Sequence, residues 1–167
     1  MNLDAVGAGV TVFIDANIFI YHFTGASEEC TALLSRCEQG ELDGVTAVNA
    51  QLEVLHRLML VEAVNKKLVE PPHILNKLRK QPQKIRQLSD YYVNTQRILE
   101  MGVRVLPVLP ETIVASHHFR TGYGMMVNDS IIAAVMQGAG LTSIATNDGQ
   151  FKKIHGLSVF SPADMKL

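Results

Sequence analysis

The 167-residue sequence is poor in cysteine, has no tryptophan and contains no long apolar run, and these shortages exclude whole classes of protein. With only two cysteines, it does not have the disulfide framework of a small secreted domain. No apolar run approaches the roughly 18 residues of a membrane span, and the start, "MNLDAVGAGV", lacks the charged segment of a signal peptide. We therefore expect a cytoplasmic protein with no membrane partner.

Both cysteines, Cys30 and Cys37, lie in "SEECTALLSRCEQG", which predicts a helix with Ser27 as its N-cap. Their spacing places both thiols on one helical face beside Leu33 and Leu34, too far apart for an unstrained disulfide. A metal pair would need further soft ligands nearby in sequence, and none is evident. We expect both thiols to be small buried hydrophobic groups.

Charge is nearly balanced overall but unevenly distributed. The net charge is −1, from 15 basic and 16 acidic residues. Residues 66–104 hold nine basic and three acidic residues, so this segment carries about +6 and the remainder about −7. The stretch "NKLRKQPQKIRQLSDYYVNTQR" interleaves cations with tyrosines, which is typical of a surface that faces nucleic acid. A solvated helical face explains the same charges, and the sequence leaves both interpretations open.

Short β-branched runs alternate with segments of helical spacing along the chain. The predicted strands are 10–15, 44–49, 103–109, 142–146 and 157–162. Strands separated by helices predict an α/β fold with a central, mostly parallel sheet of about five strands, flanked by helices. We expect a single domain over residues 1–167, in which the proline-punctuated segment 65–100 forms a helical hairpin insertion of two helices.

Four carboxylates follow predicted strands or begin the helices after them: Asp15, Glu53, Asp129 and Asp148. In an open parallel sheet, ligands gather at the carboxyl ends of the strands, at a topological switch point. Carboxylates that converge there repel one another, so such a cluster needs a divalent cation or raised pKa values. Hard oxygen ligands without His or Cys favour Mg²⁺ or Mn²⁺ over zinc.

Each of these acids also has a structural explanation. Acidic residues favour helix N-termini, which would account for Glu53, Asp129 and Asp148 without any chemistry. In that interpretation Asn49 is the N-cap of the helix that holds Glu53. Asp15 is the hardest to explain in this way, because strand residues surround it and a buried carboxylate is costly unless its charge is used.

Four segments, "FIDANIFIY", "NAQLEVLHRL", "GYGMMVNDSIIAAVM" and "IATNDGQFKKIHGLSVFSP", resemble the successive signatures of PIN domains, particularly the VapC-like toxin ribonucleases. The resemblance covers residues 11–162. It implies a PIN-like α/β fold and Mg²⁺- or Mn²⁺-dependent hydrolysis of RNA phosphodiester bonds. It places Asp15, Glu53, Asp129 and Asp148 at the positions of the family's metal-binding acidic quartet.

The same resemblance assigns Asn17 to the polar position after the first Asp, and Thr146 to the hydroxyl position before the last one. There they would orient metal-bound waters or the phosphate. The implied partners are an RNA substrate, a second copy in a homodimer and a protein antitoxin. Two features depart from the family pattern. Gln150 stands where many relatives carry another acid, and segment 65–100 makes the chain longer than the compact toxins.

Three other functions remain open at the level of sequence. His117 and His118 suggest a metal-free ribonuclease with a histidine base, although placement near a helix C-terminus explains them more simply. A haloacid-dehalogenase-type phosphatase would use Asp15 as its nucleophile, but Asn17 stands where such enzymes have a second Asp. A PIN-like module that binds RNA or protein without cutting is the third, and the intact acids argue against it.

The basic residues of segment 65–100 lead to a separate prediction. If they hold the RNA backbone, their neutralisation weakens binding and flattens its salt dependence. The residues concerned are Lys77, Arg79, Lys80, Lys84 and Arg86. An unchanged salt dependence would assign the segment to solvent or to a dimer interface.

Overall fold

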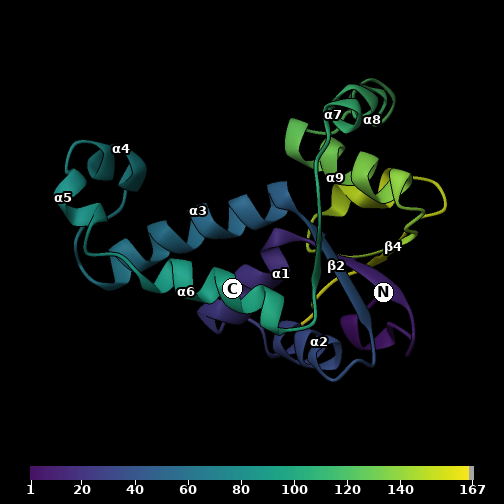
Figure 1. Cartoon of the computed structure of the whole chain (residues 1–167), viewed down its shortest axis with the longest axis horizontal. Coiled ribbons are helices and arrows are strands. Elements are labelled where there is room, and N and C mark those ends of the chain that lie inside the picture. The colour runs from purple at the N-terminus through teal and green to yellow at the C-terminus, as the bar shows by residue number, and fades with distance from the viewer. Residues whose placement is uncertain (166–167) are drawn as a thin grey trace.

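The computed structural model describes residues 1–165, and within them five strands form one sheet (Figure 1). The strands are β1 (Thr11–Ile14), β2 (Asp43–Ala47), β3 (Arg104–Leu106), β4 (Ser143–Ala145) and β5 (Ser158–Phe160). Their order is β3-β2-β1-β4-β5, and every neighbouring pair is parallel. The α/β class and the five-stranded parallel sheet are thus confirmed.

Strand β1 is the centre of the sheet and of the core. Val12, Phe13 and Ile14 each have 0% of their surface exposed. Because successive strand residues point to opposite faces, such a run must be covered on both sides. Phe13 lies in register with Val45 on β2 and Ile144 on β4. A strand buried on both faces has a continuous apolar sequence, which is why it could be predicted.

Helices alternate with the strands along the chain (Figure 1). They are α1 (Ala16–Thr24), α2 (Glu28–Glu38), α3 (Val48–Asn65), α4 (Ile74–Arg79), α5 (Pro82–Ile85), α6 (Asp90–Glu100), α7 (Pro110–Ala115), α8 (His117–Tyr123) and α9 (Val127–Gly138). Two 3₁₀ turns, η1 (Leu3–Ala5) and η2 (Gly149–Lys153), complete the order. In residues 1–165 no helix combines the length and apolarity needed to span a bilayer.

The local predictions for α2 are confirmed. Ser27 is its N-cap, and the Ser27 hydroxyl accepts a hydrogen bond from the backbone N–H of Cys30 at 3.0 Å. Cys30 and Cys37 are both buried and free. Burial raises the pKa of each thiol to about 11, so both are chemically quiet at neutral pH.

Helix α3 begins earlier than predicted. Its first residue is Val48 and its N-cap is Ala47, so the prediction that Asn49 caps this helix is wrong. Strand β2 runs directly into the helix with no intervening loop. Glu53 therefore lies in the second turn, beyond the first turn in which a helix macrodipole acts strongly.

Segment 65–100 projects from the sheet, but not as two helices. Helix α3 is 18 residues long and α6 packs back along it, so these two helices are the legs of the hairpin (Figure 1). The short helices α4 and α5 form its tip, and Pro82 begins the second of them. The prediction of two helices is therefore wrong, since the segment holds three. We call residues 66–89, between the two legs, the arm.

The arm has a small apolar core of its own. The buried side chains of Ala63, Val69, Leu78 and Leu88 cluster apart from the main core. Leu78 comes from α4, and the others come from α3 and from the loops on either side of α4 and α5. The arm is therefore an ordered extension of the fold.

Glu62 fixes the base of the arm. Its side chain is 7% exposed and accepts hydrogen bonds from the Lys66 ammonium at 2.6 Å, the Ser89 N–H at 2.9 Å and the Tyr91 N–H at 2.8 Å. Burial alone would raise the pKa of Glu62, but these donors lower it to about 2. The carboxylate thereby holds the start of α6 against α3.

Candidate active site

The sheet order reverses direction at its central strand. From β1 the chain builds outward through β2 to β3 on one side, and through β4 to β5 on the other. Such a reversal opens a crevice at the carboxyl ends of the strands, where ligands bind. Asp15 directly follows β1, and its backbone N–H donates to the carbonyl of Ala145 at the end of β4 at 3.0 Å. Thr146 and Asp148 follow β4, so three of the predicted residues lie at this switch point of the sheet.

Asp15 is buried and tightly held. Its side chain is 6% exposed, and Oδ1 accepts a hydrogen bond from the Ala16 N–H at 2.7 Å. Oδ2 accepts from the Asn17 amide at 2.6 Å and the Thr146 hydroxyl at 2.5 Å. The two polar residues proposed from the family resemblance thus both contact the first acid and set the direction in which its carboxylate points.

The residues after β4 are joined to the same network. Oδ1 of Asn17 accepts a hydrogen bond from the Asn147 N–H at 3.1 Å, and the Thr146 hydroxyl accepts one from the Asp148 N–H at 3.0 Å. Oδ1 of Asp148 accepts from the Gln150 N–H at 2.8 Å and caps the turn η2. Its second oxygen has no hydrogen bond within residues 1–165 and is available to a ligand.

Glu53 and Asp129 come from α3 and α9, which pack against each other. The Asn128 amide donates to Oε2 of Glu53 at 2.6 Å, and the Asn49 amide donates to Oδ1 of Asn128 at 2.8 Å. Asn49 therefore links two helices instead of capping one. Sequence reasoning missed Asn128 altogether. The available signal was its place directly before a predicted acid.

Charges of the predicted acids reach Asp15 and Asp129. Burial raises the pKa of Asp15 to about 6, and the negative charges of Glu53 and Asp129 add to the rise against the opposing hydrogen bonds. Burial likewise raises the pKa of Asp129 to about 6, with additions from Asp148 and Glu53. The structure thus brings all four predicted acids to one edge of the sheet, which we call the acidic rim.

No cationic side chain of residues 1–165 forms an ion pair with the acidic rim. The ion pairs within residues 1–165 involve other acids, namely Glu41, Glu62, Asp90 and Asp43. In the same residues no three His, Cys, Asp or Glu side chains lie close enough together to enclose a metal ion. Mg²⁺ keeps several waters and takes only one or two protein carboxylates, so it does not need a closed cage. A set of carboxylate, amide and hydroxyl oxygens fits such a hydrated hard cation.

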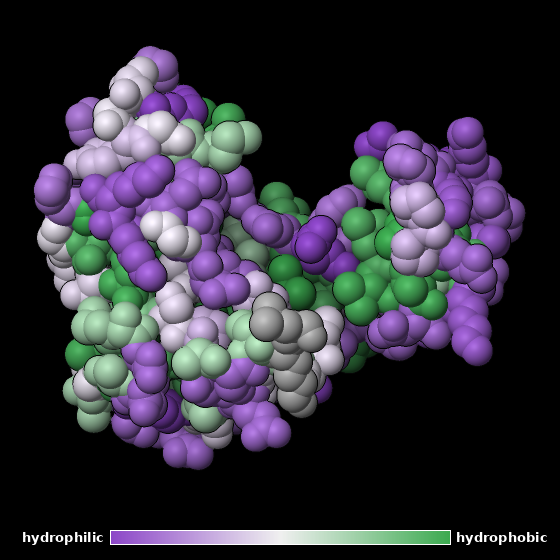
Figure 2. Space-filling model, turned by 180° about the vertical axis from the view of Figure 1, so that it is seen from behind, coloured by the Kyte–Doolittle hydropathy of each residue, from purple (hydrophilic) through white to green (hydrophobic). Residues whose placement is uncertain are grey.

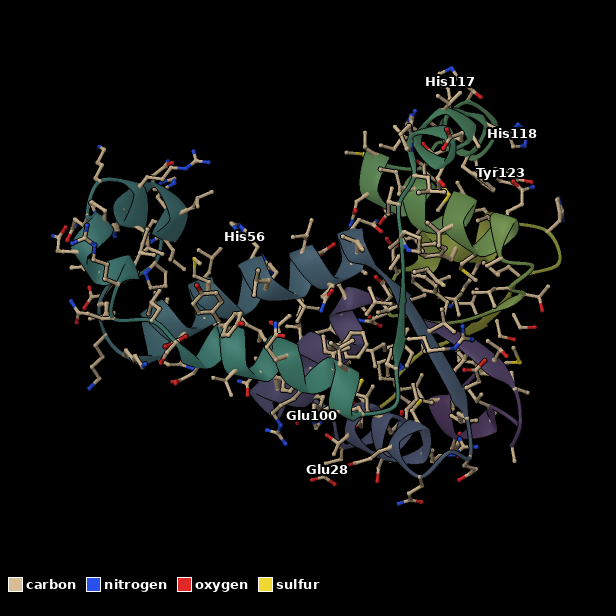
Figure 3. The ribbon with its side chains drawn as sticks, in the orientation of Figure 1. Glu28, His56, Glu100, His117, His118 and Tyr123 are labelled. Atoms are coloured by element: carbon tan, nitrogen blue, oxygen red, sulfur yellow. The ribbon has the colours of Figure 1, made fainter. Side chains whose placement is uncertain are left out.

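His117 and His118 lie on a different part of the molecule. They follow Ser116, the C-cap of α7, so they lie near a helix C-terminus as predicted, and they also begin helix α8. Figure 3 shows both on the outer surface around α8, near Tyr123. The His118 ring packs edge-on against Phe119 and Tyr123, with centroid distances of 5.6 and 6.2 Å. Within the described chain neither histidine has a hydrogen bond to an acid of the rim.

An exposed apolar surface borders the acidic rim, and we call it the apolar border. It consists of Val48, Leu52, Leu109, Ile113, Val114, Met126 and Val127, each at least 40% exposed. These residues lie on α3, α7 and α9 or directly before them, and α9 packs against both other helices. The apolar border thus lies next to the helix starts that carry Glu53 and Asp129.

The chain matches the family model of the PIN domain over residues 12–157. No curated protein matches its sequence. Among solved structures it resembles a toxin–antitoxin complex from Klebsiella pneumoniae, with 20% identity, 92% of this chain and 99% of that chain covered, and a TM-score of 0.55. It also resembles VapBC2 from Rickettsia felis bound to a DNA fragment from their promoter, with 14% identity, 91% and 98% coverage, and a TM-score of 0.56. VapC20 from Mycobacterium tuberculosis, a sarcin–ricin loop cleaving toxin, has 15% identity, 84% and 92% coverage, and a TM-score of 0.56.

Proposed function

This chain belongs to the PIN domain family, and from that premise we propose that it is a divalent-metal-dependent endoribonuclease, the toxin of a toxin–antitoxin pair. The observation that carries the proposal is the buried Asp15 carboxylate, which lies among further carboxylates and has no ion pair within residues 1–165. Such a centre repels an RNA backbone until a metal ion binds. The similarity to toxins and toxin–antitoxin complexes supports the same class.

Asp15, Glu53, Asp129 and Asp148 would hold the Mg²⁺ or Mn²⁺ ion, directly or through waters. When bound, the ion supplies a water of lowered pKa and neutralises charge on the scissile phosphate and the leaving oxygen. The acids themselves supply the negative field that attracts the ion to the end of β1 and β4. Burial and the neighbouring carboxylates raise the pKa values of Asp15 and Asp129, and a bound cation would oppose this rise.

Asn17, Thr146 and Asn128 orient the acids. Asn17 and Thr146 both donate to Oδ2 of Asp15, and Asn128 donates to Oε2 of Glu53. A carboxylate held in this way cannot rotate freely, so its remaining lone pairs keep one direction toward a ligand. Partners of this kind typically change metal affinity about tenfold to 100-fold.

The two rival enzyme mechanisms find less support. A haloacid-dehalogenase-type phosphatase needs an acid two residues after its nucleophile, and here the Asn17 amide donates to Asp15 and Thr146. A side-chain amide donates hydrogen bonds but is not acidic enough to transfer a proton to a leaving group. A metal-free ribonuclease needs a histidine beside the reacting phosphate, whereas His117 and His118 lie around α8 (Figure 3).

For the protein partners we propose two neighbouring surfaces. The apolar border suits a homodimer contact, because exposed apolar surface is stabilised when a second copy covers it. The acidic rim suits an antitoxin segment with a basic side chain, which would pair with the carboxylates and block the metal site. The three helices of the border place the two surfaces side by side.

The proposed function is tested with Asp15→Asn. Cleavage of RNA in Mg²⁺ should fall about a thousandfold, because several kcal/mol of transition-state stabilisation depend on the metal. The wild type should lose activity in EDTA and recover it with Mg²⁺ or Mn²⁺. The matched control is Asp43→Asn, which removes the same charge at the start of β2, where Asp43 pairs with Arg104. It should cut like the wild type.

Equal cutting by the wild type and Asp15→Asn, or undiminished cutting in chelator, would refute the metal-dependent mechanism. The ends of RNAs cut during expression, read by sequencing, would identify the substrate.

A further inference from the structure

The arm concentrates the positive charge of the chain. Residues 66–89 contain seven basic residues and one acidic residue, Glu70, whereas the other residues contain eight basic and fifteen acidic ones. The arm therefore carries about +6, and the rest of the chain about −7. Charge of one sign on an ordered projection attracts a partner of the opposite sign.

Three of the arm's lysines are occupied within the protein. Lys66 pairs with Glu62 at 2.6 Å, Lys77 donates to the carbonyl of Glu70 at 2.7 Å, and Lys84 donates to the carbonyl of Leu68 at 2.5 Å. Lys77 and Lys84 thus hold the loop between α3 and α4, although the sequence predicted them as RNA contacts. Their role is to shape the arm.

Four cations of the arm remain for a ligand: Lys67, Arg79, Lys80 and Arg86. All four are exposed, and within residues 1–165 none has a hydrogen bond or an ion pair from its side chain. Arg79 and Lys80 are adjacent at the end of α4. Because no acid of residues 1–165 pairs with these groups, we call them the free cations of the arm.

Helix α3 connects the arm with the acidic rim. From Glu53 to the end of the helix at Asn65 the axis rises about 18 Å. Figure 3 shows His56 projecting from α3 on the side between the arm and α8, and Figure 2 shows the notch that separates the arm from the body. A groove of about 390 Å³ lies at the foot of the arm, between Arg57 on α3 and Pro71 and Ile74. The surface between rim and arm is thus concave.

We propose that the arm is a second RNA-binding surface, which holds substrate phosphates while a distant phosphodiester lies at the acidic rim. The proposal rests on the proposed function and adds a substrate class to it: RNA long enough to reach both surfaces. At an axial rise of about 3.4 Å per phosphate in a stacked strand, 18 Å corresponds to about five phosphates, so fragments of about three nucleotides reach only the rim. The free cations contact phosphates and read no bases, so the arm increases affinity without sequence preference.

The test compares two variants of the full chain with equal net charge. Arg79→Gln/Lys80→Gln removes two free cations of the arm. Arg36→Gln/Arg104→Gln removes two cations that pair with Glu41 and Asp43 away from the arm. Matched thermal midpoints of the two variants and the wild type establish that the fold is retained.

Cleavage is measured in Mg²⁺ on a trinucleotide and on a structured RNA of about 30 nucleotides. The arm variant should raise KM for the long RNA about tenfold with unchanged kcat, and the trinucleotide should be cut as by the wild type. The slope of log binding constant against log salt, measured in the Asp15→Asn background, should decrease by about 1.4. The control variant should change neither quantity.

A KM and a salt slope equal to those of the control would overturn the arm proposal and leave the nuclease intact, because the trinucleotide would still be cut. If no variant and no wild-type protein cuts RNA, the proposed function fails. The salt slope of RNA binding then still decides the role of the arm. Unchanged RNA binding combined with loss of a copurifying acidic protein would assign the arm to a protein partner and overturn the proposal.

Discussion

Two buried acids, Asp15 at the acidic rim and Glu62 at the base of the arm, have pKa values that are shifted in opposite directions. Their side chains are 6% and 7% exposed, and each accepts three hydrogen bonds. Yet the pKa of Asp15 is raised to about 6 and that of Glu62 is lowered to about 2. Burial favours the neutral form at both sites and is the main cause of the rise at Asp15, whereas at Glu62 the Lys66 ammonium and the backbone N–H donors outweigh it. Glu62 has the Lys66 ammonium, whereas Asp15 has other carboxylates.

The comparison shows that hydrogen bonds alone do not compensate a buried charge here. At the base of the arm the protein supplies its own cation, Lys66, and the resulting ion pair has a structural role. At the acidic rim no side-chain cation of residues 1–165 pairs with the acids, and there we propose that a divalent ion supplies the positive charge. The free cations of the arm are charges of a third kind, because water solvates them. They therefore reduce the stability of the fold little, although they have no partner.

The largest expected effect is a pH dependence of stability in EDTA. The pKa of Asp15 is raised from 3.8 to about 6, so the folded state binds this proton more tightly than the unfolded state. The resulting stabilisation is complete below pH 3.8, is lost as the pH rises through about 6, and amounts to about 3 kcal/mol. The raised pKa of Asp129 acts in the same direction. Urea denaturation between pH 4 and 8 measures the effect.

Asp15→Asn should flatten this pH dependence, because an amide does not titrate. Saturating Mg²⁺ should restore the stability of the wild type at neutral pH, by preferential binding to the folded state. Identical pH dependences of the wild type and the variant would show that Asp15 is not the group responsible.

A smaller effect is expected for Glu62→Gln, which keeps the shape of the side chain and removes its charge. The free energy of unfolding at neutral pH should fall by about 2 kcal/mol, because the Lys66 pair and two charge-assisted hydrogen bonds weaken. Since the pKa of Glu62 is lowered from 4.5 to about 2, its contribution is present above pH 4.5 and disappears as the pH falls toward 2. The difference between the wild type and the variant should narrow over the same range.

Glu70→Gln is the matched control for this prediction, because Glu70 is an exposed acid of the arm. Its stability should stay within about 0.5 kcal/mol of the wild type. A loss equal to that of Glu62→Gln would mean that net charge, and not the ion pair of Glu62 with Lys66, sets the stability of the arm.

The smallest effect is expected for Thr146→Val. This nearly isosteric change removes one hydrogen bond to Oδ2 of Asp15. The Mg²⁺ concentration for half-maximal cleavage should rise about tenfold, as is usual when a ligand loses an orienting partner. Thr46→Val is the control, because the hydroxyl of Thr46 is also buried but donates to the carbonyl of Ile14. An unchanged Mg²⁺ requirement in Thr146→Val would exclude the orienting role.

Much of the fold was predictable because its signals are local. A strand buried on both faces, such as β1, needs a continuous run of apolar residues, and this run is visible in the sequence. The cap at Ser27 depends on residues three positions apart. The start of α3 was predicted wrongly because Asn49 has the chemistry of an N-cap, but its amide bonds to Asn128, 79 positions away.

The features of the candidate site also divide into those that the sequence indicated and those that only the fold shows. Asp15, Glu53, Asp129 and Asp148 were proposed from their positions near strand ends, since parallel strands bring their carboxyl ends to one edge. Sequence did not indicate that Asn128 holds Glu53, because that contact joins two helices. Nor did it distinguish the free cations of the arm from Lys77 and Lys84, which bond to backbone carbonyls.

The sequence by itself determined the order of strands and helices, the carboxylates at the edge of the sheet and the excess of positive charge in one segment. Only the tertiary structure decided which of these charges have a partner. The physical reason is that the ionisation of a side chain depends on burial and on neighbours a few ångströms away, and at the rim those neighbours come from distant parts of the chain.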